Sequence, residues 1–315
     1  MIVVLTGGTG GAKLVEGLAQ ILPARELTVV VNTGDDLEWW GLHVSPDVDS
    51  VTYALAGLLS TDRGWGVEGD TFECLGVMRR MGRPAWFSIG DRDLATHLIR
   101  TELLKAGKSL AEATEEIVRK FGVAATILPM SNERVETRIE TPDGELGFQE
   151  YFVRERWQPE VRGVRFAGAQ EAKPAPGVLE AIRDAEAIII APSNPVTSIG
   201  PILAVPGIRE ALRNSEVAIA AISPIVGGTA VSGPAGALMS AQGLPVSVAG
   251  IAQSYGDFLN TLIVDSRDTE AAVDLRSLGI EVHCTNTIMK SAADKVELAR
   301  TCLRVFKGAR SAQSA

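Results

Sequence analysis

The chain has 315 residues, of which 46% are hydrophobic and 22% charged, and its formal net charge is -9. This composition is typical of a globular protein with a large buried core, and the negative charge argues against a nucleic acid or an anionic membrane as partner. Three cysteines at unrelated spacings predict neither disulfides nor a zinc site, and no apolar run reaches the roughly 18 residues of a membrane span, so we expect a cytoplasmic protein.

Continuous apolar runs of strand length recur along the chain. They cover residues 2–5, 27–31, 187–191, 217–222, 245–251 and 261–265. Strands that are apolar without alternation are typical of a parallel sheet covered on both faces. Helical segments lie between them, at residues 13–21, 177–184, 208–213 and 269–278. This alternation predicts an α/β fold with a Rossmann-like, doubly wound parallel sheet.

The alternation stops between residues 50 and 175, which we predict to form an inserted subdomain of mixed α+β structure. Its helical patterns, at residues 50–59, 72–81, 94–106 and 110–121, precede two alternating strands around a Pro-Asp-Gly turn. Residues 1–49 and 176–307 would form the nucleotide-binding core, followed by a flexible tail at 308–315. Because ligands of open α/β sheets bind at the carboxyl ends of the strands, the insertion should form the second wall of the site.

A glycine-rich loop, LTGGTGGAKL, joins the first predicted strand to the first helix. Backbone amides at a helix N-terminus can hold an anion. Walker A requires glycine before Lys13 and a hydroxyl after it, and the dinucleotide fingerprint requires an acid in place of Asn32, so neither standard motif fits. The loop is either a plain turn or a nonstandard phosphate site, in which Lys13 adds a point charge. The substrate-binding candidates are Thr6, Gly7, Gly8, Thr9, Gly10, Gly11, Lys13 and Asn32.

Two later strands are also followed by polar loops. The first, APSNPVTSIGP, supplies the substrate-binding candidates Ser193, Asn194, Thr197 and Ser198, and the second is SPIVGGTAVSGPAG, which begins at Ser223. Three such loops at successive strand ends predict a crevice lined with amides and hydroxyls.

An acidic cluster follows the second strand, in the stretch NTGDDLEWWGLHVSPDVDS. Carboxylates that converge there would repel one another without a cation, so we predict that Asp35, Asp36 and Asp49 hold Mg²⁺, which bridges carboxylates and phosphates. Asp47 either caps the following helix or belongs to this acidic cluster. Trp40 and its neighbouring tryptophans are either core residues or a stacking surface for a planar ligand.

A further predicted helix begins in FSIGDRDLATHLIR. Asp91 either caps this helix or faces the substrate. Arg92 either forms a surface ion pair or holds an acidic group of the ligand. His97 either packs in the core or acts at the site.

These residues together resemble the 2-phospho-L-lactate transferases of deazaflavin coenzyme biosynthesis. Eight segments carry the resemblance, in the order LTGGTGGAKL, VVNTGDD, SPDVDSVTYALAGL, RGWGVEGDTF, GDRDLATH, ILPMSNERVET, APSNPVTSIGPIL and SPIVGGTAVSGPAG. The resemblance implies a Rossmann-like homodimer. It implies transfer of a phospholactyl or phosphoenolpyruvyl group from a guanosine diphosphate-linked donor to 7,8-didemethyl-8-hydroxy-5-deazariboflavin (FO), with release of GMP and help from Mg²⁺, in coenzyme F(420) biosynthesis.

The resemblance also implies that Asp49 and Arg92 act on the deazaflavin acceptor or on the reacting phosphate. Archaeal relatives carry Ala-Glu-Asp where this chain has Gly34, Asp35 and Asp36, which leaves the metal ligand open between the two aspartates. The alternative is a non-catalytic nucleotide- or nucleotide-sugar-binding regulator of the gluconeogenesis-factor type, which shares the glycine loop. The segments WWG, SPDVD and GDRDLATH favour the transferase, because a sensor would not need them.

Overall fold

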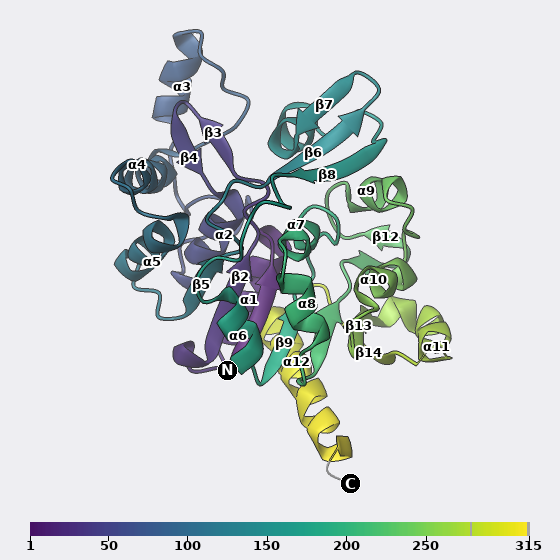
Figure 1. The fold of residues 1–315 in the computed structure, drawn as a ribbon. Helices are drawn as coiled ribbons and strands as arrows, with labels where there is room; N and C mark the ends of the chain where they lie inside the picture. Colours follow the sequence, from purple (N-terminus) through teal and green to yellow (C-terminus); the bar gives the residue numbers. More distant parts are fainter. Residues whose placement is uncertain (278, 314–315) are drawn as a thin grey trace.

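The computed structural model describes residues 1–277 and 279–313, and its centre is a seven-stranded sheet (Figure 1). The strands are β1 (Ile2–Thr6), β2 (Leu27–Val31), β5 (Thr126–Pro129), β9 (Ala187–Ile190), β10 (Ile219–Ile222), β13 (Thr261–Asp265) and β14 (Glu281–Thr285). They lie in the order β14-β13-β10-β9-β1-β2-β5, and every pairing is parallel. The strand order reverses between β1 and β9, so the predicted doubly wound sheet is confirmed and its switch point lies between these two strands.

Helices cover both faces of the sheet, as the continuous apolar strands predict. Val3 and Leu5 of β1 belong to one core cluster, and Val4 belongs to the other. The first face is packed against α6 (Val178–Asp184), α7 (Ile199–Ala204), α8 (Ile208–Arg213), α10 (Val248–Tyr255) and α11 (Thr269–Ser277). The second is packed against α1 (Thr9–Ala19), α2 (Pro46–Leu55), α5 (Leu110–Lys120) and α12 (Ala292–Gln313).

The predicted insertion is divided by a strand of the main sheet. β5, which lies within residues 50–175, pairs with β2 at the sheet edge, so α2, α5 and β5 belong to the core. The strand has only four residues and ends in Pro129, which an edge strand tolerates, and both features hid it in the sequence. The domain boundaries predicted at residues 50 and 175 therefore do not separate the core from the insertion.

Two separate pieces remain outside the main sheet and the helices that cover it, and Figure 1 shows both at the top of the molecule. The first contains β3 (Leu37–Trp39), β4 (Leu42–Val44), α3 (Glu73–Arg80) and α4 (Asp91–Lys105). The second is an antiparallel sheet of β7 (Gly144–Gly147), β6 (Glu136–Thr141) and β8 (Gly163–Ala167), which confirms the predicted hairpin. The backbone N–H of Thr137 on β6 donates to the carbonyl of Gly34 at 2.7 Å, just beyond β2. This piece therefore lies at the carboxyl edge of the sheet, as expected for the second wall.

Several local elements differ from what the sequence led us to expect. Residues 245–251 contain the start of α10, not a strand, because β10 pairs directly with β13 and leaves no place between them. β14, which we did not predict, forms the other sheet edge. The backbone of α12 is helical to Gln313 where a flexible tail was expected, and residues 314–315 of that tail lie outside the described residues. The predicted helix at 269–278 ends at Ser277, and residue 278 also lies outside the description.

The remaining short elements are β11 (Ile225–Val226), β12 (Thr229–Ala230), α9 (Ala235–Ala241) and the one-turn helices at Ala24–Glu26, Glu150–Arg154 and Ser266–Asp268. Within the described part of the chain, every helix is too short or too polar to cross a bilayer.

Candidate active site

The glycine loop after β1 packs against the polar loop after β9, at the switch point of the sheet. The backbone N–H of Gly7 donates to Ser193 Oγ at 3.2 Å. A Cβ at Gly7 would lie 2.4 Å from Ser198 Oγ, and one at Gly10 would lie 2.5 Å from the carbonyl oxygen of Pro192. α1 begins directly after Gly8 and has no side-chain cap. Its first N–H groups therefore remain available to an anionic ligand.

Asn32 joins this loop pair to the acidic segment. Its Nδ2 donates to Asp47 Oδ2 at 2.9 Å and to the carbonyl of Thr197 at 3.3 Å. A Cβ at Gly8 would lie 2.5 Å from Asp47 Oδ1, so Asp47 reaches the glycine loop. Asp47 lies in the first turn of α2 after Ser45, the N-cap residue, and neither side chain forms a cap hydrogen bond. Of the two alternatives for Asp47, the structure therefore favours the acidic cluster over the helix cap.

Asp35 and Asp47 form the acidic pair of the site. Asp35 is buried, and its Oδ1 has no hydrogen-bond partner among the described residues. Burial and the charge of Asp47 raise the pKa of Asp35 well above its usual range. Burial also raises the pKa of Asp47 to about 7, although the hydrogen bond from Asn32 opposes this. A divalent cation between these two side chains would offset both effects, so their chemistry fits Mg²⁺.

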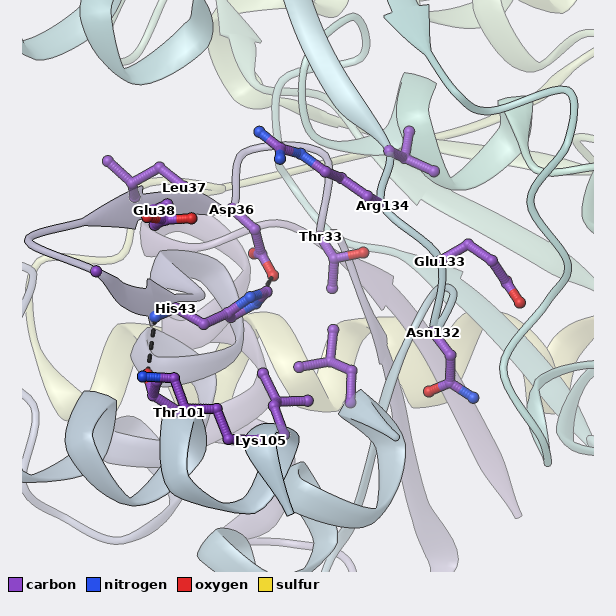
Figure 2. Close-up of a pocket in the computed structure, with 14 residues that line it drawn as sticks. Thr33, Asp36, Leu37, Glu38, His43, Thr101, Lys105, Asn132, Glu133 and Arg134 are labelled. Carbon is purple, nitrogen blue, oxygen red and sulfur yellow. Dashed lines mark hydrogen bonds and ion pairs between the residues drawn. The ribbon is translucent and has the colours of Figure 1, made fainter. Parts of the chain in front are cut away.

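Asp36, the second predicted metal ligand, is already bonded elsewhere. Its Oδ2 accepts a hydrogen bond from Ser45 Oγ at 2.7 Å and lies 2.9 Å from His43 Nε2. Figure 2 shows Asp36 and His43 pointing toward each other beside Thr33 and Thr101, in a second cavity of about 450 Å³. Burial raises the pKa of Asp36, and His43 partly offsets this. Asp36 Oδ1, like Asp35 Oδ1, has no hydrogen-bond partner among the described residues, so Asp36 is set apart by the contacts of its Oδ2 with Ser45 and His43.

Asp49, the third predicted ligand, is the centre of a buried network on α2 and α4. Arg100 donates to both of its carboxylate oxygens, with 3.1 Å between Nη1 and Oδ2. His97 Nδ1 lies 3.6 Å from Asp49 Oδ2, and His97 Nε2 lies 3.3 Å from Asp93 Oδ1. The hydroxyl of Tyr53 donates to Asp93 Oδ1 at 2.8 Å. Asp49, Asp93 and His97 have the spacing of a metal cluster, but the guanidinium already neutralises Asp49.

A cavity of about 400 Å³ opens above these acids, and we call it the aromatic cavity. Its polar lining comes from the glycine loop, α2 and α4, and its flat walls come from both pieces of the insertion. The lining includes Thr9, Asp47, Asp49, Asp93 and His97, together with Trp65, Phe87, Phe148, Phe152 and Trp157. Its volume suits a small organic ligand, and the rings favour a planar one.

Three rings of the aromatic cavity form a stacked series. Phe148 and Phe152 lie 5.4 Å apart between centroids at 13°, and Phe152 and Trp157 lie 5.1 Å apart at 26°. Phe152 belongs to a π-helical turn, a rare element that is common at functional sites. Arg156 and Trp157 have φ of +51° and +48°, a conformation that costs side-chain-bearing residues about 1–3 kcal/mol. No sequence pattern indicated this presentation of Trp157.

Several predicted site residues lie outside the lining of the aromatic cavity. Asp91 accepts hydrogen bonds from Thr71 Oγ1 and from the first N–H groups of α3, and the bond from Thr71 lowers the pKa of Asp91. Arg92 is exposed and donates to the carbonyl of Glu68 at 3.2 Å. Trp40 donates its indole N–H to the carbonyl of Pro84 at 2.9 Å. Lys13 is half-buried on α1.

The remaining predicted residues shape the loops of the site. Asn194 Oδ1 accepts from the backbone N–H groups of Val196 and Thr197, at 2.9 and 3.3 Å, which forms the turn after β9. A Cβ at Gly11 would lie 1.4 Å from Thr6 Oγ1, so only glycine fits there. The structure therefore gathers the glycine loop, Asn32, Asp35, Asp49, His97 and the loop after β9, and adds Asp47, Arg100, Asp93 and the aromatic walls.

Comparison with known proteins assigns this chain to a protein family. The family model described as 2-phospho-L-lactate transferase CofD matches residues 2–296. The 2-phospho-L-lactate transferase of Methanosarcina mazei is 44% identical over 97% of this chain and 100% of its own length. The phosphoenolpyruvate transferase of Streptomyces griseus is 42% identical over 98% of this chain and 99% of its own length.

A solved structure shares the fold at low identity. The crystal structure of a UPF0052 family protein from Bacillus halodurans superposes with a TM-score of 0.65 at 20% identity, over 96% of this chain and 98% of that one. The match to the family model and the sequence identity of the transferases, each over nearly the whole chain, go beyond a shared fold. The chain belongs to the 2-phospho-L-lactate transferase CofD family.

Proposed function

We propose that this protein transfers a phospholactyl or phosphoenolpyruvyl group from a guanosine diphosphate-linked donor to FO, and releases GMP, in coenzyme F(420) biosynthesis. One observation carries the proposal beyond family membership. The aromatic cavity joins, within about 400 Å³, Thr9 of the glycine loop, the carboxylates of Asp47 and Asp49, and the wall that ends in Trp157. A phosphorylated donor and a planar acceptor can therefore meet in one space.

The switch point suits the diphosphate of the donor. The uncapped N-terminus of α1 offers backbone N–H groups, and Ser193 and Ser198 add hydroxyls beside Gly7. Phosphoryl-group transfer depends mainly on positioning and on charge neutralisation, and such groups supply both.

The aromatic cavity suits the deazaflavin. The stacked series that ends in Trp157 offers a flat face to a ring system. Asp49, at the polar end, would then orient the terminal ribityl hydroxyl and accept its proton, although a base contributes modestly to a loose transition state. Arg92 lies outside this lining, so Asp49 is the predicted residue with the better claim to a catalytic role.

We propose Asp35 and Asp47 as the residues that hold Mg²⁺, in place of the predicted set of Asp35, Asp36 and Asp49. The unpartnered Oδ1 of Asp35 and the raised pKa of Asp47 support this assignment. Asp36 also has an unpartnered Oδ1, but its Oδ2 is held by Ser45 and His43, and both oxygens of Asp49 are held by Arg100, which disfavours these two. When bound, the ion would supply charge neutralisation at the phosphates.

The test is a transfer assay on the purified protein. The protein is incubated with Mg²⁺, FO and equal amounts of lactyl- and enolpyruvyl-diphosphoguanosine. Mass spectrometry then identifies the products. We expect GMP and a phospho-acid adduct of FO, and the adduct's mass identifies the donor. Nucleotide binding without any binding of FO would instead support the regulator. The homodimer implied by the resemblance remains a prediction, which sedimentation analysis tests.

A further inference from the structure

Arg100 is a charged side chain with no exposure to solvent. It lies on α4 with a relative exposure of 0%, and it is the largest fully buried side chain among the described residues. Burial of a guanidinium is costly unless a partner compensates its charge. The partner is Asp49, itself only 4% exposed, and both of its oxygens accept from Arg100. A bidentate pair of this kind fixes the plane of the carboxylate as well as its charge.

The two partners differ in their access to the aromatic cavity. Asp49 lines the cavity, whereas Arg100 is outside its lining and lies behind Asp49. His97 also lines the cavity, and its Nδ1 lies 3.4 Å from Arg100 Nη1. Arg100 is therefore placed to act on a ligand in this cavity through Asp49 and His97, which it contacts and which line the cavity.

We propose that Arg100 is the positioning residue for Asp49: it fixes the carboxylate so that the lone pairs not used by the guanidinium face the acceptor hydroxyl. This inference rests on the proposed function. Arg92, which the resemblance implied to act on the acceptor or the reacting phosphate, is instead exposed and bonds to the carbonyl of Glu68.

The test is a double-mutant comparison of kcat in the transfer assay. Arg100→Met removes the donors and keeps the length of the side chain, and we expect kcat to fall at least tenfold while the KM of the donor changes less than twofold. In the Asp49→Asn background the same replacement is expected to change kcat less than twofold, because nothing is left to position. An equal loss in both backgrounds overturns the proposal, since Arg100 would then act independently of Asp49.

Two further measurements keep the test decisive. If Arg100→Met does not fold, Arg100→Lys retains the charge but not the bidentate geometry, and an unchanged kcat in that variant overturns the proposal. A crystal structure of either variant is informative without any turnover: we expect the Asp49 carboxylate to rotate, and an unmoved carboxylate refutes positioning. Absence of turnover in the wild-type protein would refute the proposed function and leave this structural comparison to decide the role of Arg100.

Arg209 provides the matched control. It also forms a bidentate pair with an aspartate, Asp257, at 2.9 and 2.6 Å, but on the surface and outside the aromatic cavity. Arg209→Met is expected to leave kcat within twofold of the wild-type value. A tenfold loss in this variant would show that removal of any such pair lowers kcat, and would count against a specific role for Arg100.

Discussion

Asn32 and Asp47 share a hydrogen bond of 2.9 Å that ties the loop after β2 to the first turn of α2, beside the glycine loop. Asn32 stands where the dinucleotide fingerprint requires an acid, and its amide can donate to a carboxylate where an acid would repel one. The bond holds Asp47 at the switch point although burial raises the pKa of that carboxyl to about 7. This is the physical basis of the proposed metal site.

Asp47→Asn should abolish the effect of divalent metal on stability. In the wild-type protein, Mg²⁺ at about a hundred times its Kd should add roughly 2–3 kcal/mol to the free energy of unfolding, because it binds only the folded state. Thermal unfolding with and without metal measures this.

The folded pKa of Asp47 exceeds its unfolded value, so at pH 8 the ionised group destabilises the metal-free protein. Asp47→Asn should therefore unfold at a higher temperature than metal-free wild type.

Asp36→Asn provides the comparison for the metal site. Asp36 bonds to Ser45 and His43 in the second cavity, so its loss should leave the Mg²⁺-induced rise in Tm intact. Equal loss of the metal response in the Asp36 and Asp47 variants would contradict the assignment of Asp35 and Asp47.

Trp157→Ala should weaken the binding of the acceptor FO and leave the binding of the donor unchanged. The ring ends the stacked series in the aromatic cavity, and an aromatic pair contributes about 1 kcal/mol, or roughly a fivefold change in affinity. Steady-state kinetics should show a rise of about fivefold in the KM of FO, with the KM of the donor unchanged. Trp40→Ala is the control, because Trp40 bonds to Pro84 outside this cavity and should not alter either KM. Similar KM values for FO in wild type and Trp157→Ala would exclude stacking.

Gly11→Ala should destabilise the protein although alanine is the better helix former. The new Cβ would lie 1.4 Å from Thr6 Oγ1 and 2.8 Å from Thr6 Cβ, and such overpacking costs about 1–3 kcal/mol. Gly76→Ala in α3 is the opposite case, since the nearest heavy atom is 3.6 Å away on the flexible Arg80 side chain. That variant should gain about 0.5–1 kcal/mol. Urea unfolding compares the two, and equal signs would contradict the packing argument.

Asp265→Asn should cost stability at neutral pH but not in acid. Burial by itself would raise the pKa of Asp265. Hydrogen bonds from Arg267 and from the Thr287 N–H outweigh burial and lower this pKa to about 2. Relative to an unfolded value of about 3.9, this corresponds to about 2–3 kcal/mol at low salt. A lowered pKa gives stability that is complete above the unfolded pKa and is lost as the pH falls through the folded one. The difference in unfolding free energy between wild type and variant should therefore shrink between about pH 4 and pH 2.

Urea unfolding across this pH range measures the effect of Asp265. Asp184→Asn is the control, because Asp184 pairs with Arg183 on the surface and water screens the pair. That substitution should have little effect at any pH. A difference for Asp265→Asn that stays constant down to about pH 2.5 would mean that the ionised carboxylate is not its source.

The main sheet could be predicted because each strand carries its own signal, a short run of apolar residues. Strands such as β1 and β9 are apolar at every position, and a parallel sheet covered on both faces is the structure that buries such runs. The glycine loop was equally visible, since close approach excludes a Cβ. β5 and β14 were missed because these edge strands of four and five residues have too little apolar pattern to be distinguished from loops.

The amino-acid sequence by itself determined the helix and sheet layers of the fold and the loop segments that lie at the candidate active site. Only the tertiary structure decided which side chains meet there, because that depends on helix phase. Asp47 and Asp49 are about 200° apart around α2, so one faces Asn32 and the other faces Arg100. Arg92 and Arg100 likewise differ by about 80° around α4, and only Arg100 points to Asp49. Residues that are close in the sequence can therefore face different partners once each helix is packed.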